Sequence, residues 1–172
     1  MPTLVKDPPP AGFEALLEQR RRLDQDRRDE VWEGVLHMIP PASHAHEELV
    51  MTLGFLLRPY AKANGMSLTG SVAIGTSKEN YRAPDLAMHR PEAAAQWHPT
   101  AAVVVEILSP DDETWEKLPF YAAHHVDELV IVDPRERTVQ WFALAGEQYR
   151  PIDASGLIGL GPGELAHQID WP

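Results

Sequence analysis

The eight residues from Ala101 to Leu108 constrain the fold of this chain more than any other segment. All but Glu106 are apolar, and Val103, Val104 and Val105 form an unbroken β-branched run. Such a run is typical of a central strand that is covered on both faces. Inside it, an ionised Glu106 costs free energy to bury unless a cation, strong hydrogen-bond donors or a proton compensates. The segment therefore predicts a buried acidic residue that needs a partner.

A second acidic residue stands at the start of another predicted strand. Asp85 follows Pro84 and precedes the apolar residues Leu86, Ala87 and Met88. Two neighbouring strands could bring Asp85 and Glu106 to one edge, which would form the all-oxygen pocket that Mg²⁺ or Mn²⁺ prefers. The residues alone leave a plainer alternative open. Glu106 could form an ion pair or reach solvent at the end of the sheet, and proline is ordinary at the first position of a strand.

Three further polar residues are candidates for the same site. Lys117 lies in the helix predicted after the Glu106 strand, and this chain reversal can return its ammonium group to stabilise charge on a phosphate. Glu30 precedes a predicted strand, and His46 lies in the first turn of a predicted helix. Most helical lysines are solvated, however, and solvated or capping roles are the default for Glu30 and His46. The eight histidines show no HExxH spacing that would specify zinc.

The apolar periodicity and the turn residues predict the order of the elements. We expect helices over residues 13–23, from Ser43 to the stop at Asn64-Gly65, and over 113–124, with strands over 31–39, 67–74, 81–89, 101–108, 129–132 and 138–145. The glycine-rich segment from Gln148 onward is expected to hold short edge strands. This order predicts the α/β class, with a mixed sheet and helices packed on it.

Composition limits the class of protein. With 172 residues and 44% hydrophobic residues, the chain fits one domain over residues 1–172, in which residues 1–12 are expected to be a loose tail. There is no cysteine, which excludes disulfides and cysteine metal sites. The N-terminus lacks a signal peptide, and the longest apolar stretch, residues 49–57, is too short to span a membrane. A cytoplasmic protein without a membrane segment is expected.

The net charge of −11 argues against nonspecific binding to nucleic acid. The charge is uneven, because residues 1–90 carry 11 Lys and Arg against 12 Asp and Glu, whereas residues 91–172 carry 4 against 14. A polyanion would therefore approach the N-terminal half or meet the protein through a bound metal ion. The arginines at positions 20, 21, 22, 27 and 28 are interleaved with Asp24, Asp26 and Asp29, which favours a solvated helix face.

Several of these residues together resemble a known family. The segments Pro84-Asp85, Val105 to Pro110, Lys117 with Tyr121, and Ile131 to Pro134 are similar to those of the Uma-two family of restriction endonucleases, in the PD-(D/E)xK nuclease superfamily. The resemblance runs from about Phe13 to Ala145. Glu30 to Gly34 resembles the early Glu-x-x-x-Gly element of the family, and His46 resembles its histidine. Leu108 stands where the superfamily motif would have lysine, and Lys117 matches the relocated lysine of this family.

The resemblance implies a restriction-endonuclease-like mixed β-sheet core flanked by helices. It also implies a Mg²⁺-dependent (or Mn²⁺-dependent) nuclease that acts on nucleic acid. Because the family often forms dimers, a homodimer is expected. By this resemblance Asp85 and Glu106 hold the metal ion, and Lys117, Glu30 and His46 complete the catalytic set. DNA is the expected substrate of phosphodiester hydrolysis.

Two other functions stay open. One is a non-catalytic, oligomeric interaction or regulatory protein that keeps the nuclease fold, as the acidic balance of residues 91–172 would allow. The other is a metal-dependent hydrolase of substrates smaller than nucleic acid. An arginine that fills the gap between Asp85 and Glu106 by salt bridging would count against the enzymatic hypothesis.

Overall fold

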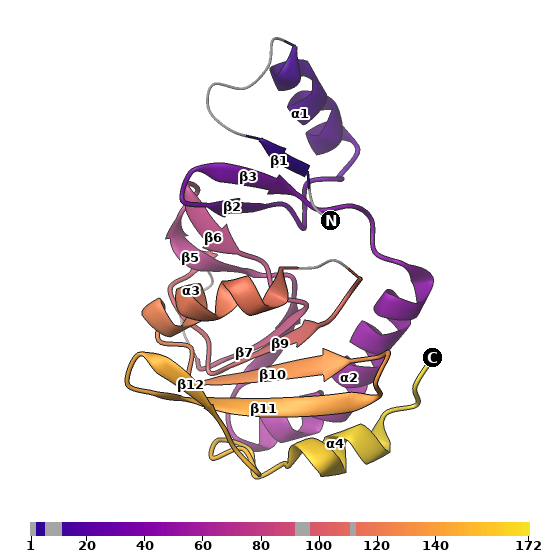
Figure 1. Cartoon of the computed structure of the whole chain (residues 1–172), viewed down its shortest axis with the longest axis vertical. Helices are drawn as coiled ribbons and strands as arrows, with labels where there is room; N and C mark the ends of the chain where they lie inside the picture. The colour runs from indigo at the N-terminus through magenta and orange to yellow at the C-terminus, as the bar shows by residue number, and fades with distance from the viewer. Residues whose placement is uncertain (1–2, 6–11, 92–96, 111–112) are drawn as a thin grey trace.

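The computed structural model describes residues 3–5, 12–91, 97–110 and 113–172, which form strands in two sheets with helices around them (Figure 1). The helices are α1 (Phe13–Arg22), α2 (His44–Ala63), α3 (Leu118–Ala123) and α4 (Pro162–Gln168), and the 3₁₀ helix η1 (Thr114–Lys117) precedes α3. The predicted α/β class is confirmed. Residues 111 and 112, which precede the helix predicted over residues 113–124, lie outside the described residues.

The strands form two six-stranded sheets rather than the one sheet that was expected. Sheet A has the order β1 (Thr3–Val5), β3 (Val35–Met38), β2 (Glu30–Trp32), β6 (Asn80–Arg82), β5 (Ala73–Ser77) and β8 (Trp97–His98). Sheet B has the order β12 (Gln148–Pro151), β11 (Thr138–Ala145), β10 (Glu128–Asp133), β9 (Val103–Ile107), β7 (Leu86–His89) and β4 (Ser67–Gly70). Sheet A lies above sheet B in Figure 1. Both sheets are mixed, because β9 pairs with β10 and β5 pairs with β8 in parallel.

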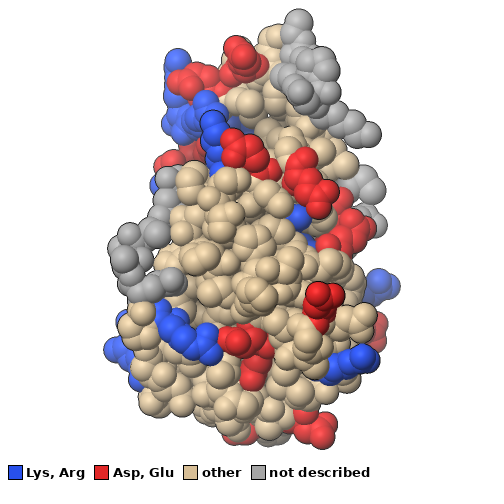
Figure 2. All heavy atoms as spheres, turned by 90° about the vertical axis from the view of Figure 1, so that its left-hand side faces the viewer, with Lys and Arg blue, Asp and Glu red and all other residues tan. Residues whose placement is uncertain are grey.

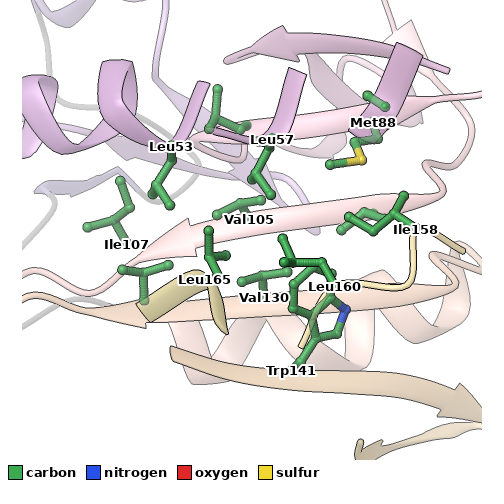
Figure 3. Packing of buried hydrophobic residues seen from close by; sticks show 14 of the residues in the cluster. Leu53, Leu57, Met88, Val105, Ile107, Val130, Trp141, Ile158, Leu160 and Leu165 are labelled. Atoms are coloured by element: carbon green, nitrogen blue, oxygen red, sulfur yellow. The ribbon is translucent and has the colours of Figure 1, made fainter. Parts of the chain in front are cut away.

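Strand β9 is the central buried strand that its sequence predicts, since all five of its residues are buried. Val103, Val105 and Ile107 belong to the core cluster that also contains the buried leucines of α2. Figure 3 shows Val105 and Ile107 packed near Leu53 and Leu57. Val104 belongs to the second cluster, with Tyr121 of α3. The two-residue period of a strand therefore directs alternate residues of β9 to opposite faces.

The predicted strand over residues 31–39 is wrong as a single element. Glu33 and Gly34 both have positive φ, 51° and 86°, and they form the turn of a hairpin between β2 and β3. Successive positive φ values are typical of the tight turns that join antiparallel strands. Gly34 marked this turn in the sequence, but the apolar residues on both sides of it gave the appearance of one strand.

The predicted strands over residues 67–74 and 81–89 are each divided between the two sheets. The first provides β4 to sheet B and β5 to sheet A, and the second provides β6 to sheet A and β7 to sheet B. The segment Ala83 to Asp85 therefore connects the two sheets. Apolar periodicity reports that a residue is buried but not which sheet buries it, so the sequence pattern could not show the division.

The C-terminal segment contains a helix where only edge strands were expected. Strand β12 is followed by α4, in which Leu165 has no exposed surface and packs in the same core cluster as α2. Buried Glu128 fixes the preceding loop, because its carboxylate accepts hydrogen bonds from Trp141, Ser155 and the backbone N–H of Gly156. The glycines and Pro162 concealed the helix from a propensity argument.

Part of the N-terminal segment, for which a loose tail was expected, is a strand, and residues 1–2 and 6–11 lie outside the described residues. Thr3–Val5 form β1, which pairs antiparallel with β3. Without β1, strand β3 would be an edge strand with a row of unpaired backbone N–H and C=O groups, and the pairing satisfies them. Among the described residues, no helix has the length and hydropathy needed to cross a membrane.

We predict that α4 is an integral part of the core. Leu165→Ala should lower the free energy of unfolding by about 2–5 kcal/mol, because it removes a fully buried side chain and leaves a cavity. Met51→Ala is the matched control, since Met51 is 60% exposed and its loss should have little effect. Urea unfolding measures both. Equal stability of the two variants would contradict the placement of α4.

Candidate active site

Asp85 and Glu106 are brought together by the pairing of β7 with β9. The antiparallel register pairs Leu86 with Val105, so one further step along it sets Asp85 opposite Glu106. Residues opposite each other in an antiparallel pair share a face of the sheet and lie close together. Glu106 is on the face that carries α3, because the Tyr121 hydroxyl donates a hydrogen bond to its Oε1 at 2.5 Å.

Asp85 is buried, and both of its oxygens have partners. Oδ2 accepts a hydrogen bond from the backbone N–H of Ile107 at 2.9 Å. Oδ1 is 2.9 Å from Nε2 of His46 and also accepts from Nη2 of Arg28. Burial acts to raise the pKa of Asp85, but the hydrogen bond and charge of His46, with the charge of Arg28 and the Ile107 N–H, outweigh it and lower that pKa. Asp85 is therefore held as a carboxylate.

Glu106 shares the ammonium group of Lys117 with Glu30. Nζ of Lys117 lies 3.2 and 3.3 Å from the two oxygens of Glu106 and 3.0 Å from Oε1 of Glu30. Burial raises the pKa of Glu106 to about 7, and the negative charges of Asp85 and Glu30 act in the same direction, while Lys117 and the Tyr121 hydroxyl oppose them. Burial acts to lower the pKa of Lys117, but the charges of Glu106 and Glu30 outweigh it and raise that pKa. The proton therefore stays on Lys117.

Glu30 comes from sheet A and is fixed by that sheet. Its Oε1 accepts from the backbone N–H of Ala83 at 2.9 Å, and its Oε2 accepts from Nε1 of Trp32 at 2.7 Å. Glu30 and Trp32 are two residues apart on β2, so their side chains lie on the same side of the strand. All three bonds of Glu30, including the one from Lys117, hold its carboxylate in a single position.

A stack of rings and one guanidinium group supports this side of the site. The Arg82 guanidinium lies between the rings of Trp32 and Phe120, 4.2 and 4.1 Å from their centroids. The ring of His37 stacks on the ring of Trp32, and the ring of His124 packs against Phe120. Because the stack links β2 to α3, it fixes the strand that carries Glu30 relative to the helix that follows Lys117.

One cavity of about 280 Å³ brings the predicted site residues together. Its lining includes all five of them and one residue that the sequence argument assigned elsewhere: Glu30, His46, Asp85, Glu106, Lys117 and Arg28. The roles given to the five residues stay a prediction, but their proximity is a feature of the fold. Trp32 and Tyr121 were not among the predicted site residues, yet each donates a hydrogen bond to a site carboxylate.

The arginines do not form the single solvated helix face that was predicted. Arg28 lies beyond α1, is 24% exposed and reaches Asp85, while Arg20 forms an ion pair with buried Asp29 at 2.6 Å. Arg21, Arg22 and Arg27 are exposed as expected. Helix α1 ends at Arg22, so Arg28 is not part of a helix face and the prediction of its exposure from helical periodicity did not apply. The buried partner of Arg28, Asp85, is 57 residues away and gave no local signal.

A salt-bridging arginine between Asp85 and Glu106 would count against the enzymatic hypothesis, and the structure contains such an arginine at one of the two carboxylates. Arg28 forms a salt bridge with Asp85, and among the described residues its side-chain hydrogen bonds are with Asp85, His46 and Glu47 rather than with Glu106. Glu106 has its own cation in Lys117. The gap between the two carboxylates is thus flanked by two cations rather than filled by one.

The donor set fits a magnesium-like ion with few protein ligands. The described residues contain no group of three or more His, Cys, Asp or Glu side chains arranged to hold a metal. Mg²⁺ keeps several waters and is commonly held by one or two carboxylates. Three carboxylates, Glu30, Asp85 and Glu106, pair with two basic side chains, Lys117 and Arg28. Asp85 and Glu106 are therefore the oxygen ligands that such an ion would find.

Comparisons with known proteins indicate the family and the fold of this chain. The family model described as "Uma2: Putative restriction endonuclease" matches residues 13–166. A crystal structure described as "a putative nuclease belonging to DUF820 from Anabaena variabilis ATCC 29413" is similar, with a TM-score of 0.61 and 16% identity over 81% of this chain and 90% of that chain. This likeness shows the fold, which is restriction-endonuclease-like as predicted.

A second solved structure is more distant. The cryo-EM structure of a DrdV–DNA complex matches with a TM-score of 0.37 and 17% identity, covering 72% of this chain and 12% of that chain. A likeness of this size carries no argument. The comparison with curated proteins found no match.

We predict that Lys117 is essential to the stability of the cluster. Lys117→Met should lower the free energy of unfolding by about 3–5 kcal/mol, because it leaves two buried carboxylates without their shared cation. Adding Glu106→Gln should recover part of the loss. Urea unfolding in the presence of EDTA measures this, with exposed Lys62→Met as the control. A Lys117→Met variant as stable as the control would refute the described charge balance.

Proposed function

This chain belongs to the Uma2 family, and from that premise we propose that it is a nuclease that hydrolyses phosphodiester bonds in DNA with the help of a divalent cation. One observation carries the proposal. Asp85, directly before β7, and Glu106, on the adjacent strand β9, were predicted from the sequence as a pair, and both line a cavity that Lys117 also lines. Family membership supports nuclease chemistry in general, and the metal ion and the DNA substrate are the parts that we add.

In this proposal Asp85 and Glu106 hold Mg²⁺ or Mn²⁺. Such an ion, when bound, polarises a scissile phosphate and lowers the pKa of an attacking water molecule. Lys117 keeps a fixed positive charge at the floor of the cavity, where it offsets negative charge that develops on the phosphate. Because Glu30 holds the ammonium group at 3.0 Å, this charge is positioned before substrate binds.

The surrounding residues orient these groups. His46 and the Ile107 N–H fix the two oxygens of Asp85, and the Tyr121 hydroxyl fixes one oxygen of Glu106. Burial and the charges of Glu106 and Glu30 raise the pKa of Tyr121 well above its usual value, so its hydroxyl remains a donor. Tyr121 is thus a positioning residue, and Glu30 acts through Lys117.

The charge distribution supports a local rather than an extended attraction for nucleic acid. Figure 2 shows one face of the molecule, on which Lys and Arg side chains lie among Asp and Glu at both ends and a broad uncharged area lies between them. Extended basic surfaces supply most nonspecific affinity for DNA. With a net charge of −11, this chain would depend on the bound cation and on the few cations of the cavity.

A second candidate function is a non-catalytic interaction protein that keeps the fold. The observation that favours it is the complete pairing of the three carboxylates with His46, Arg28, Lys117 and neutral donors. A cluster that is satisfied by its own cations can serve stability alone. Binding of a divalent cation separates the two candidates, because only the nuclease requires it.

We also propose that the protein is a homodimer that pairs through α1. This helix has no buried residue, and Leu16 and Leu23 are 43% and 56% exposed. Glu14 lies in its first turn and three arginines lie in its last turn. In a two-fold, antiparallel pairing of two copies, the acidic start of each helix would meet the basic end of the other. The pairing would cover the exposed leucines.

We predict that Asp85→Asn and Glu106→Gln abolish Mg²⁺-dependent cleavage of plasmid DNA and lower the affinity for Mn²⁺ by at least about tenfold. Calorimetry measures the affinity, and gel electrophoresis measures the cleavage. Glu116→Gln is the matched control, because Glu116 is exposed on η1 next to Lys117.

The outcomes distinguish the candidate functions. Full cleavage by Asp85→Asn would eliminate the assignment of the site. Absence of Mn²⁺ binding by the wild-type chain would favour the interaction protein. Turnover of small phosphodiesters with intact DNA would indicate a hydrolase of smaller substrates.

For the dimer, we expect Leu16→Glu to convert the protein to a monomer in sedimentation equilibrium, because a charge would replace an apolar contact. Phe55→Glu on α2 is the control, since Phe55 is 74% exposed and lies on another element. A wild-type monomer, or a Leu16→Glu variant that still dimerises, would disprove pairing through α1.

A further inference from the structure

We propose that Arg28 is a phosphate-binding residue that Asp85 holds until a divalent cation binds and releases it. The inference rests on the proposed function, because it assigns a role to a residue at the same cavity. It goes beyond that function by naming a group that recognises the substrate and a contact that regulates its access.

Arg28 connects a buried carboxylate to an exposed one. Its Nη2 donates to Oδ1 of Asp85, whose side chain is 6% exposed, and its Nη1 donates to Oε1 of Glu47 at 2.9 Å, where the glutamate is 56% exposed. The arginine side chain itself is 24% exposed. The guanidinium therefore lies at the wall of the cavity, with one end inside it and the other near solvent.

The backbone that carries Arg28 is fixed, so only the side chain needs to move. The next residue, Asp29, is buried and accepts hydrogen bonds from Arg20 at 2.6 Å and from the backbone N–H of Ile39 at 2.9 Å. These bonds tie the chain to α1 on one side and to the end of β3 on the other. Rotation of the arginine side chain toward Glu47 leaves them intact.

A divalent cation and Arg28 would compete for the same oxygen. Oδ2 of Asp85 is used by the Ile107 N–H, so Oδ1 is the oxygen that faces Arg28 and His46. Without Arg28, the three carboxylates of Glu30, Asp85 and Glu106 face Lys117 and, at Asp85, the ring of His46, so negative charge remains in excess and a divalent ion would offset it. Asp85 keeps its bonds to His46 and Ile107 in either case. The exchange therefore replaces one cation with another.

The released guanidinium would remain at the cavity. Glu47 lies in the first turn of α2 and continues to hold Nη1, which keeps Nη2 available for a ligand. A guanidinium group binds phosphate oxygens through two parallel hydrogen bonds. The start of α2, where Ser43 and His46 also line the cavity, adds a partial positive charge that favours an anion. A phosphodiester beside a bound cation would thus meet Arg28.

The test compares Arg28→Gln with Arg27→Gln in the full-length chain. Arg27 is the matched control, because its loss removes the same charge while its side chain is 72% exposed and pairs only with exposed Asp24 among the described ion pairs. Calorimetry with Mg²⁺ alone measures release of the contact. We expect Arg28→Gln to bind Mg²⁺ at least about tenfold more tightly than the wild type, because a charged hydrogen bond no longer competes. Arg27→Gln should stay within about twofold of the wild type.

The second measurement uses dimethyl phosphate, a stable phosphodiester. For the wild type, saturating Mg²⁺ should increase the affinity for this probe, and Arg28→Gln should lose most of that increase. Arg28→Lys keeps the charge but cannot bridge Asp85 and Glu47 with a planar fork, so its Mg²⁺ affinity should lie between those of wild type and Arg28→Gln. Thermal melting shows whether each variant folds. If Arg28→Gln does not fold, the comparison of Arg28→Lys with the wild type provides the test.

Each result decides a part of the inference. Unchanged or weaker Mg²⁺ binding by Arg28→Gln, when the wild type binds Mg²⁺, would overturn the release of Arg28 and leave the proposed function intact. Tighter Mg²⁺ binding with an unchanged response to dimethyl phosphate would overturn the phosphate-binding role. If neither the wild type nor any Arg28 variant binds Mg²⁺, both the inference and the metal site of the proposed function fail.

Discussion

The ion pair between Glu106 and Lys117 is the interaction on which the rest of the site depends. A carboxylate in the middle of a central strand, flanked by Val105 and Ile107, would be very unfavourable without a nearby positive charge. Lys117 supplies that charge from the segment that follows the same strand, and Glu30 shares it from the other sheet. The three groups therefore join β9, η1 and β2 through a single buried ammonium group.

The division of the strands between two sheets explains why these groups meet. Asp85 ends the segment that crosses from sheet A to sheet B, so it stands where the two sheets adjoin. Glu30 reaches the site from sheet A and Glu106 from sheet B, while the α2 start brings His46. The cavity is a consequence of this junction. Its acidic groups are balanced by cations that come from separate segments, and such a balance can change when a ligand enters.

The sequence predicted the central strand and the long helix α2, it singled out five polar residues that all line the cavity, and the family that it indicated is confirmed. These features have local signals: the apolar run around Glu106, the cap at Ser43 that accepts the N–H of His46 at 3.2 Å, and short motifs around Asp85 and Lys117. The two sheets, the helix α4 and the contact of Arg28 with Asp85 were not predicted. Each depends on partners distant in the chain: Arg28 and Asp85 are 57 residues apart, and α4 is defined by the burial of Leu165 in a core built from other elements.

The metal site is the central claim, and a crystal structure of the protein soaked with Mn²⁺ tests it most directly. The anomalous signal of manganese locates the ion without any knowledge of the substrate. We expect one ion between the carboxylates of Asp85 and Glu106, with the Arg28 guanidinium turned away from Asp85 toward Glu47. A crystal that contains no manganese at these carboxylates, with Arg28 still bound to Asp85, would contradict the metal site.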